Sequence, residues 1–297
     1  MSRRWEAERI ARAYLMLTRT AGDENAAVLV AEAGPVLAAQ HTASVTGVDW
    51  RRADVLLDTA AAAGVRLLAP EDEDWPAALP KVLPTNGRGL GAAPPLGLWV
   101  RGNGHLDLIT RRVVCVAGTR NASPYGDKAA FNLARDLASD GWTVITSGGF
   151  GIGGSVIRGA LSASGPVLVL PPAPLSTIVP TGHRKLFDRT ARNGLLLTEA
   201  APGVPVPERA ADRQAQLAAG LAAAVVLIEP AQGGPDRSLV QLAENTGRLL
   251  LAYPGPISAP TCGFAHHLIR AGRAQLVAGP QQVLTDLEGV TGAREQG

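Results

Sequence analysis

Residues 118–126 bring together groups that can hold a phosphate. The segment reads Gly-Thr-Arg-Asn-Ala-Ser-Pro-Tyr-Gly and follows a short apolar run. A glycine permits a tight turn there, hydroxyl and main-chain N–H groups can donate to phosphate oxygens, and an arginine can bridge two of those oxygens. The residues predicted to bind phosphate are Gly118, Thr119, Arg120, Ser123 and Gly126. The alternative is an ordinary strand-to-helix turn that carries a solvated arginine.

A second glycine-rich segment, residues 147–154, reads Ser-Gly-Gly-Phe-Gly-Ile-Gly-Gly. Its glycines let the main chain approach an anion closely and leave N–H groups available to it. The predicted anion-binding residues are Ser147, Gly148, Gly149, Gly151 and Gly153. The acidic residue that would bind the ribose of a dinucleotide is missing from residues 165–170. We therefore expect no dinucleotide or other cofactor, and the alternative is a turn that binds nothing.

The distribution of charge predicts an anionic partner for the middle of the chain. Residues 101–200 hold eleven Lys and Arg against six Asp and Glu, although the net charge of the whole chain is only +2. Within residues 183–192, Lys185, Arg189 and Arg192 follow one another at steps of four and three, which places them on one face of a helix. Lys185 and Arg189 are the predicted phosphate contacts. Taken alone, such a stripe is also typical of a solvated helix face.

No group of residues points to catalysis or to a metal site. Cys262 and His266 are four residues apart but have no further ligands in register. The chain contains no GxSxG motif and no Walker A lysine motif. Glu199 and Glu229 follow predicted strands, where we expect loop or cap residues rather than catalytic acids. The two cysteines form no CxxC pair, so a reducing cytoplasm fits and neither a disulfide framework nor a zinc site is expected.

The glycine-rich segments need strands that end next to them, and the periodicity of the sequence predicts such strands. Short apolar runs predict buried strands at residues 113–117, 143–146, 167–170, 195–198, 225–228 and 249–253. Helical patterns fall between them at residues 127–140, 155–162, 184–192, 213–221 and 239–246. This alternation predicts an α/β fold with a Rossmann-like, doubly wound, mostly parallel sheet covered by helices on both faces. Ligands of such sheets bind beyond the carboxyl ends of the strands.

A small helical domain is predicted before the sheet. Asp23 is expected to cap a helix that ends at Gly34-Pro35. The N-terminus shows no signal peptide and no apolar run is long enough to span a membrane, so we expect a cytoplasmic protein with no membrane partner. The predicted segments are a helical domain (1–68), a Pro/Gly-rich linker (69–97), the Rossmann-like domain (98–289) and a tail (290–297).

Together these segments resemble the family of DNA-processing protein A (DprA/Smf). The likeness runs from about residue 70 to residue 287, and its landmarks occur in the order of the family. They are the entry to the domain (98–102), the phosphate loop (118–126), the "SGxARGID…GAL" stretch (147–161), the "PxGHxxLFxxIAxxGLLxSE" stretch (180–199) and the "VPGPxxSPxSxGxxxLIRxGA" stretch (253–272). The resemblance implies a divergent member with a SAM-like helical N-terminus and without the C-terminal winged-helix module of many members.

The resemblance also implies a function. Members bind single-stranded DNA without catalysing a reaction, form a homodimer and pass the strand to a RecA-type recombinase during DNA uptake in competence and transformation. This sequence departs from the family in the second glycine-rich segment, where the Arg and the Asp of the motif are missing. The family's Arg-Asn-Arg run falls on residues 214–216, Gln-Ala-Gln here, which leaves Arg213 as the predicted contact. DNA binding should then depend on Arg120, Lys185 and their neighbours, or the ligand is another anion.

Two other functions remain open at the level of sequence. One is a nucleotide-binding sensor, or an enzyme of the same fold that resembles the phosphoribohydrolases of nucleoside monophosphates. That class has a PGGxGTxxE stretch, and residues 233–236 match only its first glycines. The other is a scaffold that has lost all ligand binding.

Overall fold

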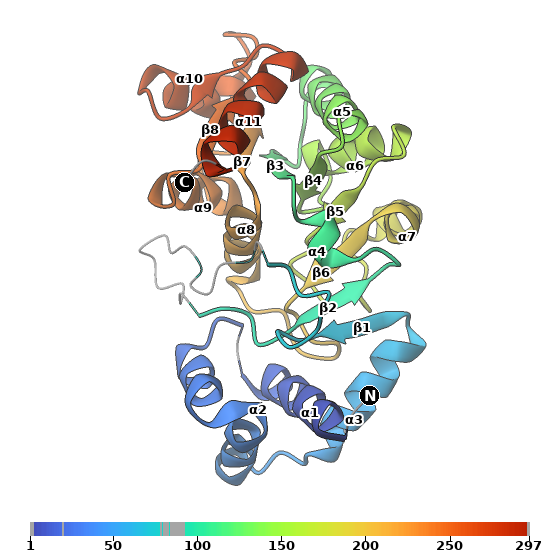
Figure 1. Cartoon of the computed structure of the whole chain (residues 1–297). Helices are drawn as coiled ribbons and strands as arrows, with labels where there is room; N and C mark the ends of the chain where they lie inside the picture. Colours follow the sequence, from blue (N-terminus) through green and yellow to red (C-terminus); the bar gives the residue numbers. More distant parts are fainter. Residues whose placement is uncertain (1–2, 20, 78, 80–82, 84–92, 296–297) are drawn as a thin grey trace.

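Three N-terminal helices lie at one end of the molecule in the computed structural model (Figure 1), which describes residues 3–19, 21–77, 79, 83 and 93–295. They are α1 (Arg3–Thr18), α2 (Glu24–Thr46) and α3 (Arg51–Ala62). As predicted, Asp23 caps α2, because its side chain accepts a hydrogen bond of 3.0 Å from the N–H of Ala26. The rings of Tyr14 and Trp50 stack with their centroids 5.1 Å apart, which joins α1 to the start of α3.

Helix α2 is interrupted where the sequence predicts its end, but it does not stop there. Gly34 has a φ of +80°, and Pro35 then begins a second helical stretch that runs to Thr46. Proline is tolerated at a first helical position because its missing N–H would have no partner there. Ala38 and Ala39 are buried in this stretch. Its packing against α1 is a tertiary contact that the local pattern does not reveal.

The last residues of the predicted helical domain (1–68) form a strand rather than a helix. Residues Val65–Leu68 form strand β1, which pairs antiparallel with β2 (Leu98–Arg101). Strand β1 therefore belongs to the large sheet and not to the helical segment. Within residues 69–97 the described positions contain no helix, in agreement with the proline-rich composition.

A single nine-stranded sheet organises the rest of the chain. Its order is β1-β2-β6-β5-β4-β3-β7-β8-β9. The remaining strands are β3 (Val113–Gly118), β4 (Thr143–Thr146), β5 (Val167–Val169), β6 (Leu195–Thr198), β7 (Ala224–Ile228), β8 (Leu249–Ala252) and β9 (Gln275–Leu276). All pairs from β6 to β9 are parallel, whereas β2 pairs antiparallel with both of its neighbours, β1 and β6. The predicted Rossmann-like, mostly parallel sheet is confirmed.

Helices cover both faces of this sheet because successive strand residues are apolar on both sides. Val114 and Val116 face one core, and Cys115 faces the other. On the first side lie α5 (Pro124–Ser139), α6 (Ile152–Ser162), α7 (Arg184–Asn193) and α11 (Pro280–Glu295). On the second side lie α4 (Leu106–Ile109), α8 (Ala210–Leu221), α9 (Gly234–Asn245) and α10 (Gly263–Arg270). None of the helices in the described part of the chain is long and apolar enough to cross a membrane.

The C-terminal residues differ from the predicted tail. Helix α11 continues through Glu295, so the described part of residues 290–297 is helical. Val283 and Leu287 are fully buried against the core on the α5 side, which anchors this helix. The composition after residue 289 does not predict a helix. The helix continues there because its earlier turns pack against the core.

The two halves of the sheet diverge between β3 and β7. Strand β3 is followed by β4 and β5 on one side, whereas β7 is followed by β8 and β9 on the other. Gly118, the last residue of β3, lies so close to β7 that a Cβ there would be 1.8 Å from the main-chain oxygen of Ile228. A glycine is required at this position because the two central strands leave no space for a side chain.

This contact generates a prediction for stability. Gly118→Ala should lower the free energy of unfolding by about 2–3 kcal/mol, because the added methyl group forces the two central strands apart. Gly233→Ala is the matched control, since no atom lies within 4 Å of a Cβ at that position, and as a change at the N-cap of α9 it should cost no more than about 1 kcal/mol. Urea denaturation of both variants measures the difference. Equal stability of the two variants would contradict the close approach of β3 and β7.

Candidate functional site

The first glycine-rich segment closes around a carboxylate of the protein itself. Glu229 follows β7 with a φ of +47°, and its main-chain oxygen accepts a hydrogen bond of 3.0 Å from the N–H of Thr119. Its carboxylate accepts from the Ser123 N–H (2.9 Å), the Ser123 hydroxyl (2.5 Å) and the Thr261 hydroxyl (3.1 Å). Ser123 also caps α5. The carboxylate therefore lies at the positive end of that helix.

This carboxylate occupies the position that the sequence assigns to a phosphate. Ser123 donates to Glu229, and the N–H of Gly126 donates to the Ser123 hydroxyl at 3.2 Å. A Cβ at Gly126 would lie 2.4 Å from a carboxylate oxygen of Glu229. The donors of Ser123 and Gly126 are used within the protein, which argues against their assignment to an external phosphate. Arg120, in contrast, is exposed and makes no hydrogen bond or ion pair with any described residue.

The second glycine-rich segment packs directly on the first. The N–H of Ile152 donates to the main-chain oxygen of Thr119 at 3.1 Å. Gly151 has a φ of +64°, and a Cβ there would lie 2.6 Å from the same oxygen, so both its conformation and its surroundings require glycine. Gly153 lies in the first turn of α6 and is buried. The two segments form one surface, the glycine ridge (residues 118–123 and 147–151), at the carboxyl edge of the sheet.

His183, from the start of α7, supports this ridge. Its Nδ1 donates to the main-chain oxygen of Gly148 at 2.9 Å, and the residue is 7% exposed. The ring of Phe150 meets the imidazole edge-on, with the centroids 4.9 Å apart and the planes at 74°. Gly154 of α6 leaves space for the side chains of His183 and Arg158, because a Cβ there would be 2.9 Å from the imidazole and 3.3 Å from Nη1 of Arg158. The imidazole and the Arg158 guanidinium thus flank the same point of α6.

Arg158 is a basic residue of this site that the sequence analysis misses. Its Nη2 donates to the hydroxyl of Ser155 at 2.7 Å, and that hydroxyl donates to Asp127 of α5 at 2.6 Å. Ser155 is 1% exposed, so the chain of hydrogen bonds holds the guanidinium from the interior, although Arg158 itself is exposed. A signal exists in the sequence, since Arg158 lies one helical turn after Gly154 on the same helix face.

The predicted basic residues of α7 lie on the exposed side of that helix. Lys185 and Arg189 are exposed, while Phe187 is buried in the core. Asp188 is paired with Arg101 of β2 at 2.6 Å, so the one acidic residue of α7 is neutralised. Lys185 lies in the first turn of the helix, two residues after His183, whose ring is bonded to the glycine ridge. Arg189 lies about 6 Å farther along the helix axis.

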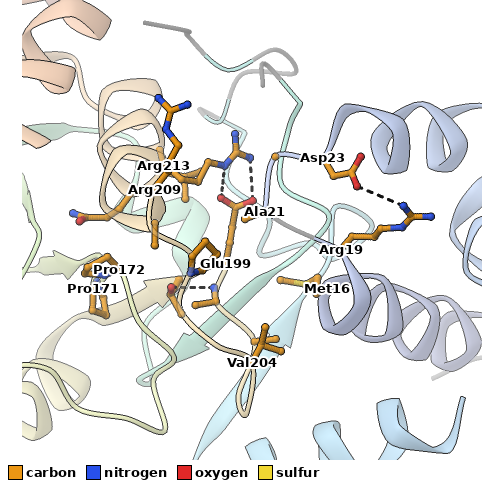
Figure 2. A pocket seen from close by; sticks show the side chains of 18 of the residues that line it. Met16, Arg19, Ala21, Asp23, Pro171, Pro172, Glu199, Val204, Arg209 and Arg213 are labelled. Carbon is orange, nitrogen blue, oxygen red and sulfur yellow. Dashed lines mark hydrogen bonds and ion pairs between the residues drawn. The ribbon is translucent and has the colours of Figure 1, made fainter. Parts of the chain in front are cut away.

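Arg213 lies in the interior, with its guanidinium against the carboxylate of Glu199 (Figure 2). Its guanidinium donates to the carboxylate of Glu199 at 2.6 and 3.0 Å, to Gln216 at 2.5 Å and to the main-chain oxygen of Ala93 at 2.9 Å. The side chains of Arg213 and Glu199 are 7% and 6% exposed. Because its charge is compensated inside the protein, the structure argues against Arg213 as a contact to DNA. The pair borders a cavity of about 480 Å³ between the end of α1 and the sheet, lined largely by apolar residues.

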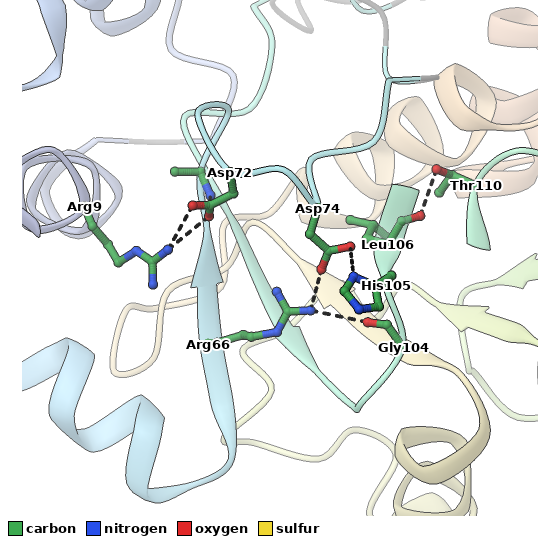
Figure 3. Close-up of polar contacts among 9 residues, drawn as sticks. Arg9, Arg66, Asp72, Asp74, Gly104, His105, Leu106 and Thr110 are labelled. Carbon is green, nitrogen blue, oxygen red and sulfur yellow. Dashed lines mark hydrogen bonds and ion pairs between the residues drawn. The ribbon is translucent and has the colours of Figure 1, made fainter. Parts of the chain in front are cut away.

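A second depression is acidic and lies near the N-terminal helices, and Figure 3 shows the ion pairs of two of its carboxylates, Asp72 and Asp74. Its acidic residues are Glu6, Asp54, Asp58, Glu71, Asp72, Glu73, Asp74 and Asp107. Arg9 pairs with Asp72 at 3.0 Å, and Arg66 pairs with Asp74 at 2.7 Å. Burial lowers the pKa of Arg9, although Asp72 opposes this effect. The excess of carboxylates makes this surface repel a polyanion.

The thiols are not reactive groups of the site. Cys115 and Cys262 are both free and buried. Burial raises the pKa of Cys115 to about 12 and also raises the pKa of Cys262, so both remain protonated at neutral pH. Among the residues that the structure describes, no three His, Cys, Asp or Glu side chains are arranged to hold a metal ion.

Comparison with known proteins reveals relatives over most of the chain. Residues 66–288 match the family described as DNA recombination-mediator protein A. The chain is similar to a putative DNA processing protein DprA of Mycobacterium tuberculosis, with 34% identity over 287 residues, 90% of this chain and 72% of that protein. It is also similar to the protein Smf of Escherichia coli, with 29% identity over 186 residues, 62% of this chain and 50% of that protein.

Two solved structures share the fold. DNA processing protein A from Streptococcus pneumoniae matches with a TM-score of 0.71 and 22% identity, over 87% of this chain and 84% of that chain. DNA processing protein A from Helicobacter pylori, described for its single-stranded DNA binding mode, matches with a TM-score of 0.63 and 23% identity, over 75% of this chain and 96% of that chain.

The buried ion pair leads to a prediction that separates a structural role from a binding role. Arg213→Ala should lower the free energy of unfolding by about 3–5 kcal/mol, because it leaves the Glu199 carboxylate buried without its partner. Arg209→Ala is the matched control, at the N-cap of the same helix. Arg209 is 43% exposed and its ion pair with Asp212 spans 3.7 Å, so its loss should change stability by less than about 0.5 kcal/mol. Urea denaturation measures both effects. Normal stability of Arg213→Ala together with lost oligonucleotide binding would restore Arg213 as a DNA contact.

Proposed function

The chain belongs to the DprA/Smf family, and from this premise we propose that it binds single-stranded DNA at the carboxyl edge of its sheet without catalysing a reaction. The names of its relatives support a role in DNA processing. The proposed contacts are the side chains around the glycine ridge rather than the N-terminus of α5.

The convergence of exposed cations around the ridge carries this proposal. Arg120 extends from the first segment, Arg158 lies beside His183, and Arg184 and Lys185 lie in the first turn of α7. A cation in a first turn is disfavoured by the helix dipole, by about 0.3–1 kcal/mol. Arg184 and Lys185 are therefore placed where an external anion would remove an unfavourable interaction. Among the described residues these four cations form no ion pair.

The ligand is proposed to be a polyanion rather than a single nucleotide. Glu229 already fills the position at the switch point of the sheet where a dinucleotide phosphate would bind in this fold. The cations instead lie along a surface, from Arg120 to Lys185 and on to Arg189, which suits successive phosphates of one strand. The acidic depression near the N-terminal helices would keep the strand on this side of the molecule.

Family membership also supports two further proposals about partners. We propose that the protein forms a homodimer and passes the bound strand to a RecA-type recombinase during DNA uptake. The family's description as a recombination mediator favours this role. Sedimentation of the purified chain tests the dimer, and assembly of recombinase filaments on strands coated by a single-strand-binding protein, with and without this chain, tests the transfer.

The alternative, hydrolysis of nucleoside monophosphates, makes a different prediction. Glu199 and Glu229, the acids that follow the strand ends, are engaged by Arg213 and by Ser123 and Thr261. We therefore expect that purified protein releases no base from a panel of nucleoside monophosphates, as followed by chromatography. Base release that Glu229→Gln abolishes, while the variant remains folded, would favour the enzyme over the DNA-binding protein.

The contribution of Arg120 is the direct test of the proposed interface. Arg120→Ala should weaken binding to single-stranded DNA by about 1.5–3 kcal/mol, because a charge-assisted contact to phosphate is lost. It should also reduce the slope of log affinity against log salt by about 0.7, the value for one contact to a single strand. Titration of a labelled oligonucleotide at several salt concentrations measures both quantities.

The control for this test is Arg111→Ala. Arg111 is also exposed, but it pairs with Asp107. It lies two residues before β3, at the amino ends of the strands, whereas the ridge lies at their carboxyl ends. Its removal should therefore leave the affinity and the salt slope unchanged. Thermal melts should show that both variants keep the stability of the parent chain. Wild-type affinity and slope for Arg120→Ala would remove Arg120 from the interface.

A further inference from the structure

An aromatic ring stands exposed in the middle of the glycine ridge. Phe150 is 48% exposed, whereas Phe187, in the neighbouring helix α7, is 2% exposed. An apolar ring of this size loses favourable free energy when it remains in water. The ring lies at the position where the family motif has small and basic residues. The fold therefore presents Phe150 outward at the site where the strand is proposed to bind.

The ring is held in one orientation by its neighbours. His183 meets it edge-on at 4.9 Å, and the imidazole is itself fixed by its hydrogen bond to Gly148. Gly182 lies against the ring, since a Cβ at that position would be 3.4 Å from it. The segment that carries Phe150 is anchored at its other end by the hydrogen bond from Ile152 to Thr119. A ring held in this way loses little conformational entropy when a ligand packs on its free surface.

Two cations lie close to the residues next to this ring. The side chain of Arg120 runs along Gly149, which precedes Phe150, with its Cγ 3.8 Å from the position of a Cβ there. Arg158 lies close to His183, the ring's edge-on neighbour, since Nη1 of Arg158 and the imidazole both approach the position of a Cβ at Gly154. A nucleic acid strand has the matching order, because each base is flanked by two phosphates. An exposed ring with two guanidinium groups nearby fits a base with its phosphates better than it fits an apolar peptide.

We propose that Phe150 stacks on a base of the bound strand, between phosphates held by Arg120 and Arg158. This inference rests on the proposed function, and it names the side chain that makes the binding selective for single strands. A duplex keeps its bases stacked on one another, so only an unpaired base can reach the ring. Phe150 thereby supplies the preference for single strands that the arginines alone do not give.

The test removes the ring and the bases in turn. The probes are a labelled oligothymidylate of about 20 nucleotides and an abasic strand of the same length, which keeps the phosphates and lacks every base. Phe150→Ala should bind oligothymidylate roughly 5- to 100-fold more weakly than the parent chain, the range for loss of one stacking contact. Its affinity for the abasic strand should equal that of the parent chain.

Two more variants and one control separate stacking from a change in the loop. Phe150→Trp should retain the preference for oligothymidylate, because it keeps a π-face, whereas Phe150→Leu should lose it although it keeps an apolar side chain. Leu108→Ala is the control, since Leu108 is 58% exposed but lies in α4, away from the ridge. It should bind both strands like the parent chain.

Each outcome is decisive. Equal losses on both strands for Phe150→Ala would show that the ring only positions the loop, and wild-type affinity of this variant for both strands would show that the ring makes no contact. Either result overturns the stacking while leaving DNA binding in place. Failure of the parent chain to bind either strand would overturn the proposed function itself, and the stacking with it.

Discussion

Glu229 accepts hydrogen bonds from Ser123 and Thr261 at the point where the two halves of the sheet diverge. The shape of the carboxyl edge depends on this contact. Through its main-chain oxygen Glu229 holds Thr119, and Thr119 in turn accepts from Ile152 at the start of α6. The second segment then offers the oxygen of Gly148 to His183, which orients the ring of Phe150. Four segments that are distant in the sequence thus become one surface.

The same carboxylate decides how an external anion can bind. A helix N-terminus at a switch point is a ready site for phosphate, but here the positive end of α5 is neutralised from within the protein. The exposed positive charge is moved outward, to Arg120, Arg158 and Lys185. Side chains on a surface contact a long polyanion at several phosphates, whereas a closed loop would hold one. This difference separates a strand-binding surface from a nucleotide pocket.

Ion pairs also attach the N-terminal helices to the sheet. Arg12 is 4% exposed and donates to the main-chain oxygen of Leu96 at 2.7 Å and to Glu71 at 3.0 Å. Arg213 lies close to the segment between α1 and α2, since a Cβ at Gly22 would be 3.1 Å from its Nη1. Buried charges of this kind give little net stability when complete, but removing one partner is costly. They therefore favour one way of docking the helices on the edge of the sheet.

The sequence by itself determined the α/β class, the strands from β3 to β8 and the cap at Asp23, because these depend on periodicity and on contacts within a few residues. It also identified both segments of the glycine ridge and the exposed face of α7. Only the tertiary structure decided that Glu229 takes the donors of Ser123 and that Arg213 is buried against Glu199. It also decided that β1 joins the sheet, that Arg158 lies close to His183 beside the ridge, and that the ring of Phe150 is exposed within the ridge. Ser123 and Glu229 are 106 positions apart. No local pattern records such a contact, since it exists only when the sheet brings the ends of β3 and β7 together.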